Sequence, residues 1–179
     1  MRRPHFIFGL TAALLAAAPG YGQTSATVSE AQIKAAFVLN FPKFVSWPAG
    51  DAAPGKPFVI GLLGQDEVGE AVRALAQNKK LGDRPLVVRR FTLVSEVAEC
   101  DLLYLAAGES RRAPVVRAAL RGRGVLTVGD WASFAREGGM IALVTDKSRI
   151  GFLANPKAAQ EAGLAISAQL LSLAKAVER

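Results

Sequence analysis

Histidine and cysteine are almost absent from this 179-residue chain, which has one of each, His5 and Cys100. A single cysteine excludes any disulfide within the chain. His5 lies in an N-terminal stretch with the layout of a secretory signal peptide, so we expect the mature chain to have no histidine. Histidine-based triads, histidine-ligated zinc and the usual general base at neutral pH are thereby excluded. We predict no catalytic residue, no metal site and no cofactor.

The N-terminal stretch has the three parts of a signal peptide. Arg2 and Arg3 are positive, residues 6–18 form an uncharged apolar run, and the small residues Gly20 and Gly22 follow. The run has about 13 residues, fewer than the ~20 that a membrane-spanning helix needs. We predict a signal peptide at 1–22, a linker at 23–28 and one domain at 29–179, with the mature protein in the periplasm. An uncleaved N-terminal anchor is the alternative.

Charge gives little support for a nucleic-acid partner. The formal net charge is +7 at pH 7, but lysine and arginine are spread along the chain. No basic stretch is interleaved with aromatic residues for base stacking, so nucleic acid is not expected. An enzyme without histidine would need paired carboxylates. The nearest candidates, Asp66–Glu67 and Glu96 with Glu99, are typical of helix starts or surface acids.

Apolar runs and helix-start signals alternate along the domain. Ser29 and Gln32 form a capping box, and Asn155 with Pro156 marks a later helix start. Strands are predicted at 58–63, 86–91, 101–105, 125–128, 140–144 and 150–153. Helices are predicted at 30–45, 67–76, 93–98, 110–121, 130–136 and, as one long final helix, from 156 to 177. We therefore predict a three-layer α/β/α single domain, with a mostly parallel sheet of five or six strands and an antiparallel edge hairpin.

In such a sheet, ligands bind beyond the carboxyl ends of the strands. The residues predicted to line a ligand crevice there are Gly64, Arg89, Gly108 and Gly129. Gly64 and Gly69 lack the spacing of a nucleotide-binding loop, so no nucleotide site is predicted. The alternative interpretation is that these residues form ordinary turns.

Cys100 lies between Glu99 and Asp101 at the start of a predicted buried strand. Neighbouring acids raise a thiol pKa and make the thiol a poor nucleophile. We expect a buried, inert thiol, with an intermolecular disulfide as the alternative.

Aromatic residues are concentrated in the first predicted helix and directly after it. Phe37, Phe41 and Phe44 recur at helical spacing and are expected to pack on the sheet. Asn40 and Trp47 break this pattern, because one is polar and the other follows the helix. They either stabilise the end of the helix or line a partner surface.

This segment, IKAAFVLNFPKFVSWP at 33–48, resembles the opening signature of the YfiR family. The resemblance continues in order to the end of the domain and covers nearly the whole mature chain. The matching pieces are FVIG at 58–61, Gly64, GDRPL at 82–86, CDLLY at 100–104, LTVG at 126–129, FA at 134–135, GGMI at 138–141, NP at 155–156 and AGLAIS at 162–167.

The resemblance implies a periplasmic repressor that binds the periplasmic sensory domain of an inner-membrane diguanylate cyclase, which lowers cyclic di-GMP and biofilm formation. It also implies a homodimer and a second partner, an outer-membrane lipoprotein that relieves repression. Candidate contact residues are Trp47, Pro48, Arg149 and Phe152. Some relatives have a redox-linked disulfide that brackets the Gly-Gly turn, but alanine occupies the matching positions here, so we expect no thiol switch.

Two other functions stay open at this point. One is a small-molecule solute-binding protein of a transport system, which would use the predicted crevice. The other is an enzyme based on carboxylates.

Overall fold

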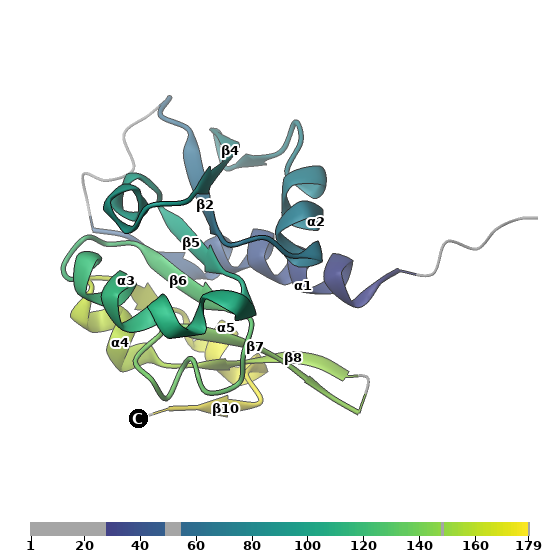
Figure 1. Cartoon of the computed structure of the whole chain (residues 1–179), viewed down its shortest axis with the longest axis vertical. Coiled ribbons are helices and arrows are strands. Elements are labelled where there is room, and N and C mark those ends of the chain that lie inside the picture. The colour runs from purple at the N-terminus through teal and green to yellow at the C-terminus, as the bar shows by residue number, and fades with distance from the viewer. Residues whose placement is uncertain (1–27, 49–54, 148, 179) are drawn as a thin grey trace, which may run out of the picture.

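The computed structural model describes residues 28–48, 55–147 and 149–178. The predicted signal peptide and all of the predicted linker except Val28 lie outside the described residues. The described chain forms an eight-stranded sheet in the order β10-β8-β7-β6-β5-β2-β4-β3 (Figure 1). Its strands are β2 (Phe58–Leu63), β3 (Lys80–Leu81), β4 (Arg84–Phe91), β5 (Leu102–Leu105), β6 (Leu126–Gly129), β7 (Ile141–Asp146), β8 (Arg149–Ala154) and β10 (Ala176–Val177). A separate two-stranded sheet pairs β1 (Val45–Ser46) with β9 (Ala165–Ile166).

The centre of the large sheet is parallel, because β4, β2, β5, β6 and β7 run in one direction. β8 returns antiparallel to β7, β10 joins β8 in parallel, and β3 pairs antiparallel with β4. This confirms the predicted mostly parallel sheet and the β7–β8 hairpin. The hairpin is not the edge of the sheet, however, because β10 lies outside it.

Helices cover both faces of the sheet and produce the predicted three layers. The helical segments are α1 (Glu30–Asn40), η1 (Phe41–Phe44), α2 (Glu67–Leu75), η2 (Val94–Glu99), η3 (Ala107–Arg112), α3 (Ala113–Ala119), α4 (Pro156–Glu161) and α5 (Ala168–Leu173), where η marks a 3-10 helix. The larger core joins α1, η1, α2, α4 and α5 to one face. The smaller core joins η2, α3 and the segment 131–138 to the other face.

The first helix begins where the sequence predicts and ends earlier. Ser29 and Gln32 exchange both hydrogen bonds of a capping box, at 2.9 and 3.2 Å. The predicted helix over 30–45 is α-helical only to Asn40, and Pro42 then lies in a 3-10 turn. Proline has no N–H to donate and its ring crowds the preceding turn, which accounts for the change.

The predicted final helix over 156–177 is wrong. Asn155 caps α4 as predicted, but the chain turns at Gly163, whose φ is +79°, and pairs as β9. Left-handed backbone of this kind cannot continue an α-helix. Ser167 then caps a second short helix, α5, and accepts a hydrogen bond from Leu170 N. The predicted stripe therefore does not form one inner face, and Leu173 is 64% exposed.

The predicted helix over 130–136 is also wrong. Residues 131–138 form consecutive turns, which end at Gly138 with φ +90°. The predicted cap, Asp130, uses its carboxylate to pair with Lys34 instead. The Phe134 ring lies over Gly129 and Gly139, where a side chain on either glycine would collide with it. Packing of this ring, and not helix propensity, determines the path of the segment.

Candidate binding surface

An apolar groove crosses the outer side of the larger core. It is formed by α1, η1, α5 and the middle of β8, with a volume of about 270 Å³. All but one of the lining residues are apolar: Ile33, Ala36, Phe37, Asn40, Phe41, Phe44, Phe152, Leu170 and Leu173. Ile33 is 38% exposed and Leu173 is 64% exposed, so the two residues form an accessible apolar rim.

Three aromatic rings form the rigid floor of this groove. Phe37 stacks on Phe41 with ring centres 6.0 Å apart, and Phe152 meets the edge of Phe41 at 5.1 Å. Phe41 and Phe152 are almost fully buried, whereas Phe37 is partly exposed. The prediction that phenylalanines of this segment pack on the sheet is confirmed for Phe41. The groove itself depends on α5, which the sequence did not place.

Asn40 and Trp47 both have defined structural partners. Asn40 donates to Ala36 O at 2.8 Å and accepts from Lys43 Nζ at 2.7 Å, which secures the last turn of α1. Trp47 donates from Nε1 to Gly124 O at 2.9 Å and packs edge-on against Phe58. Asn40 therefore stabilises the helix end and also lines the groove, whereas Trp47 joins the segment after η1 to the start of β6.

The four candidate contact residues do not form one patch. Trp47 and the exposed Pro48 lie beside Gly124 and Gly163, at the amino ends of the parallel strands. The exposed Arg149 begins β8, which pairs with the last residue of β7 at the opposite edge. Only Phe152 lines the apolar groove, where it belongs to the floor.

Three of the four predicted crevice residues follow the carboxyl ends of the neighbouring strands β2, β5 and β6, and Gly64 lies against Ala106 and Glu109. Gly64 lies at the carboxyl end of β2, with φ +90°. Gly129 ends β6 beneath the Phe134 ring, and Gly108 is exposed in η3. The exposed Arg89 lies near Glu99, at 3.5 Å, away from Gly64. The arginine beside Gly64 is Arg90, which donates to Gly64 O at 3.4 Å.

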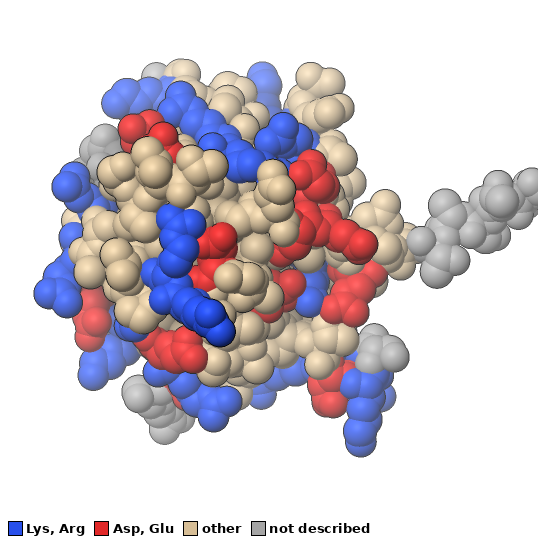
Figure 2. Space-filling view, in the orientation of Figure 1, with Lys and Arg blue, Asp and Glu red and all other residues tan. Residues whose placement is uncertain are grey.

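A polar cluster also occupies the carboxyl ends of β2, β5 and β6. Lys34 of α1 is 9% exposed and pairs with Asp130 at 2.7 Å and with Glu30 at 2.9 Å. The buried Tyr104 of β5 donates to Asp66 Oδ2 at 2.7 Å. Figure 2 shows acidic side chains gathered over the start of α1 and over α2. The cluster ties α1 to the end of the sheet.

Burial and charge pairing shift the pKa values of Lys34 and Asp130 in opposite directions. Burial raises the pKa of Asp130, and the neighbouring Lys34 only partly offsets it. Burial lowers the pKa of Lys34, but hydrogen bonds to Asp130 and Glu30 outweigh it and leave that pKa raised. Burial, and then the hydrogen bond to Asp66, raises the pKa of Tyr104. Burial therefore disfavours the charged form of Asp130, Lys34 and Tyr104 alike, and only at Lys34 do the hydrogen bonds and charges of its partners outweigh it.

Cys100 and Asp66, the other candidates for a chemical role, both make contacts that stabilise the fold. Cys100 is buried in the smaller core, and burial raises the pKa of its thiol to about 12. Its Sγ donates to Val97 O at 3.2 Å. Asp66 caps α2 by accepting from Gly69 N at 2.7 Å, as a helix-start acid does. Within residues 28–48, 55–147 and 149–178, no three acidic, histidine or cysteine side chains are grouped to hold a metal ion.

Among the helices that the structure describes, none is both long and apolar enough to cross a membrane.

Two solved structures have a similar architecture. An ABC domain in complex with L-Trp from Streptococcus pneumoniae aligns with a TM-score of 0.56 at 15% identity, over 83% of this chain and 60% of that chain. A conserved domain protein from Vibrio cholerae aligns with a TM-score of 0.58 at 13% identity, over 84% of this chain and 60% of that chain. At these identities the likeness shows the fold alone. The chain spans about 60% of the length of each of these structures, and it falls in their class of α/β domains.

Comparison of the sequence with protein families identifies the family of the chain, which the fold alone does not. Residues 31–175 match the family described as YfiR/HmsC-like, so the chain belongs to the YfiR/HmsC-like family. No curated protein matches the chain. The match covers α1 from Ala31 onward, the five parallel strands from β2 to β7 and α5, which together build the groove and all of the polar cluster except Glu30.

Proposed function

We propose that this protein is a periplasmic regulator that represses an inner-membrane diguanylate cyclase by binding the periplasmic sensory domain of that enzyme. Membership of the YfiR/HmsC-like family over residues 31–175 is the observation that supports this proposal most directly. Repression lowers cyclic di-GMP and, with it, biofilm formation. The protein acts as a homodimer, and an outer-membrane lipoprotein relieves the repression.

The groove between α1, η1 and α5 is our candidate contact surface. Its rim residues Ile33 and Leu173 are large, apolar and exposed, and the floor beneath them is apolar. An exposed apolar groove of this kind suits a helix or loop that inserts a few apolar side chains. Each Å² of apolar surface removed from water contributes about 25 cal/mol. Pro48 and Arg149 are exposed but do not line this groove, so we assign the contact to the groove first.

Repression requires only that binding shifts the equilibrium of the sensory domain toward its inactive state. A sensor that equilibrates between an active and an inactive state shifts from 1:99 to 99:1 when a partner binds one state by about 5.5 kcal/mol more tightly than the other. A groove that binds only one arrangement of the sensory domain supplies such a difference. The rim of the groove therefore determines both affinity and repression.

Calorimetric titration of this protein with the purified periplasmic domain of a cyclase from the same organism tests the proposal. Leu173→Asp and Ile33→Asp place a charge on the rim, and we expect each to weaken binding at least about tenfold, or 1.4 kcal/mol. Val115→Asp is the matched control, because Val115 is 60% exposed on α3, on the opposite face. Melting curves of all three variants verify that they fold.

The proposal predicts micromolar or tighter binding by the wild type and by Val115→Asp. Absence of binding by the wild type overturns the proposed partner. Equal affinity of the two rim variants and the control overturns the proposed surface.

A second candidate function is small-molecule binding on behalf of a transporter. The fold likeness to an ABC domain in complex with L-Trp favours it. A thermal-shift screen of amino acids distinguishes the two functions, because a ligand at 100 times its Kd stabilises the fold by about 2.7 kcal/mol. A large shift with one amino acid, together with no binding to any cyclase domain, would replace the first proposal with the second.

A further inference from the structure

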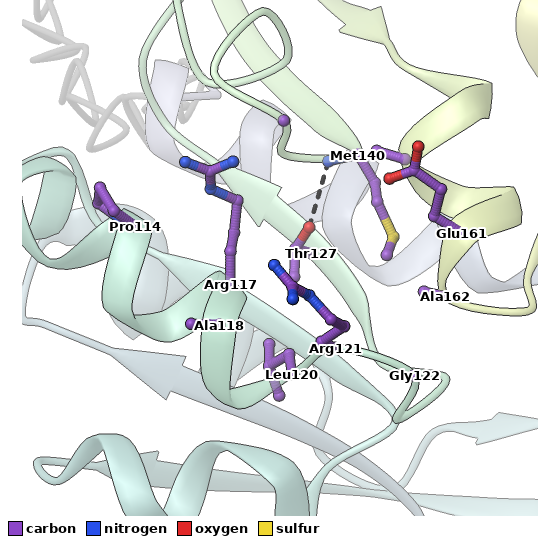
Figure 3. Close-up of a pocket in the computed structure, with 12 residues that line it drawn as sticks. Pro114, Arg117, Ala118, Leu120, Arg121, Gly122, Thr127, Met140, Glu161 and Ala162 are labelled. Atoms are coloured by element: carbon purple, nitrogen blue, oxygen red, sulfur yellow. Dashed lines mark hydrogen bonds between the residues drawn. The ribbon is translucent and has the colours of Figure 1, made fainter.

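A second cavity lies between α3 and α4 (Figure 3). Its volume is about 280 Å³. Figure 3 shows Arg117 and Arg121 extending from α3 and the turn after it, while Met140 and Glu161 face them from the opposite wall. Beside the cavity, β6 and β7 pair at two positions, Val128 with Ile141 and Gly129 with Ala142.

Arg117 supplies the observation that points to a ligand. Its Nε is buried and has no hydrogen-bond partner among the described residues. Buried N–H groups are nearly always paired in folded proteins, so an unpaired one requires an explanation. The guanidinium packs against Gly138, where a Cβ atom would collide with it and where φ is +90°. The Gly138 turn therefore leaves room for this guanidinium at the wall of the cavity.

Arg121 adds a second positive charge to the same cavity. Neither Arg117 nor Arg121 has a carboxylate within 4.0 Å in the part of the chain that the structure describes. Other arginines of this protein are paired, for example Arg84 with Asp101 at 2.9 Å and Arg112 with Glu109 at 2.8 Å. Glu161 lines the same cavity and Glu137 interacts electrostatically with Arg117, but neither acid lies within 4.0 Å of either guanidinium group. Two guanidinium groups without a paired carboxylate attract an anion, and their planar donors match a carboxylate or a phosphate.

A hydroxyl group and apolar surface complete the lining. Thr127 Oγ1 accepts from Met140 N at 3.2 Å, which leaves the hydroxyl proton free to donate into the cavity. Met140, Ala158 and Ala162 provide an apolar wall opposite the arginines. Glu161 is exposed at the rim and disfavours an anion placed near α4. The charged group of a ligand is therefore directed toward α3 and its apolar part toward α4.

We infer that this cavity binds a small organic anion, whose carboxylate or phosphate group is held by Arg117 and Arg121 and whose apolar part contacts Met140. The inference does not rest on the proposed cyclase partner, because the cavity and the apolar groove share no residue. Such binding would allow a small metabolite to regulate the protein at a site separate from the proposed protein-binding groove.

NMR of arginine Nε–Hε groups tests the inference directly on the purified protein. The probes are benzoate, phenyl phosphate and neutral benzamide, which differ in the presence and type of charged group. Arg117→Gln identifies the Arg117 resonance by its loss. We expect benzoate or phenyl phosphate to shift this resonance saturably, with an apparent Kd of about 1 mM or tighter, and the stronger probe to identify the preferred anionic group. Benzamide should cause no shift.

Variants of exposed residues keep the test independent of folding. We expect Arg121→Gln to weaken binding of the effective anion about tenfold, because it removes one charged donor. Arg111→Gln is the matched control, since Arg111 is exposed in η3 and does not line the cavity; it should bind like the wild type. An equal shift with benzamide, unchanged affinity in Arg121→Gln, or no shift with either anion overturns the inference.

Discussion

The apolar groove and the arginine cavity offer opposite kinds of surface. On the face covered by α1, η1 and α5, the groove is apolar and its floor is made of packed aromatic rings. Toward α3, two arginines without acidic partners among the described residues line a cavity of similar volume. An apolar groove suits another protein, whereas paired guanidinium groups suit a small anion. One small domain thus presents two chemically distinct surfaces that share no lining residue, although α4, which forms one wall of the cavity, packs on the same face of the sheet as α1 and α5.

Removing one buried ring from each face should have the largest effect on stability. Phe152 packs against Phe37 and Phe41 on one face, and Phe134 packs against Trp131 on the other. We expect Phe152→Ala and Phe134→Ala each to lower the free energy of unfolding by about 3–5 kcal/mol. Urea unfolding measures both. A loss below about 1 kcal/mol for either variant would show that its face is loosely packed, and the two faces would then differ in rigidity as well as in chemistry.

Gly163 separates the two surfaces along the chain, and its replacement should have an intermediate effect. α4, before it, lines the arginine cavity, and α5, after it, lines the apolar groove. Gly163→Ala places a side chain at φ +79°, which costs about 1–2 kcal/mol. Gly108→Ala is the control, because a Cβ there meets nothing within 4 Å; its effect should stay within about 0.5 kcal/mol. Equal melting temperatures for the two variants would contradict this role of Gly163.

The polar cluster that anchors the groove-bearing helix should make stability depend modestly on pH. Burial raises the pKa of Asp130, so the folded state holds this proton more tightly than the unfolded chain does. The contribution of Asp130 to the free energy of unfolding is therefore fully present below its pKa in the unfolded chain, about 4. It is lost as pH rises through its higher pKa in the folded protein. Lys34, Glu30, Asp66 and Tyr104 surround Asp130 and remain in the control variant Asp130→Asn.

Urea unfolding of the wild type and of Asp130→Asn between pH 4 and pH 7 measures this contribution. We expect the stability of the wild type relative to the variant to decrease as pH rises. A relative stability that increases with pH would mean that Lys34 outweighs burial at Asp130.

Cys100 should show the smallest effect, because it is buried under the α3 face and its thiol pKa is raised to about 12. We expect no alkylation of the native protein by iodoacetamide at pH 8 and rapid alkylation in urea, as measured by mass spectrometry. Alkylation of the native protein at the rate of the unfolded chain would indicate that the α3 face opens readily.

The sequence predicted best those elements whose apolar runs are buried on both sides. β2, β5 and β6 are such runs, and each was predicted to within one residue at either end. The two-residue strands β3, β9 and β10 were not predicted, because pairing with a distant strand creates them and no local pattern precedes them. The prediction of one long final helix was wrong for a related reason. Apolar residues spaced three and four apart also occur in two short helices that are joined by a turn at Gly163.

The candidate surfaces could be predicted only in part. The aromatic residues of α1 and η1 were expected to pack on the sheet, but the groove needs α5 beside them, and its position depends on the break at Gly163. Gly64 was correctly placed at the carboxyl end of a strand, yet the arginine beside it is Arg90 and not Arg89. Adjacent strand residues point to opposite faces, so a register error of one residue exchanges them. A turn at Gly138 that leaves room for Arg117 has no signal in the sequence beyond the Gly-Gly pair.

Hydrogen exchange of this protein, with and without the periplasmic domain of the cyclase, tests most directly whether the apolar groove is the protein-binding surface. We predict that the bound domain slows amide exchange in residues 33–44 and 168–173, which form the groove, and leaves residues 113–121 on the α3 face unchanged. Protection confined to the α3 face, or no protection in either segment at saturating concentrations of the domain, would contradict the assignment.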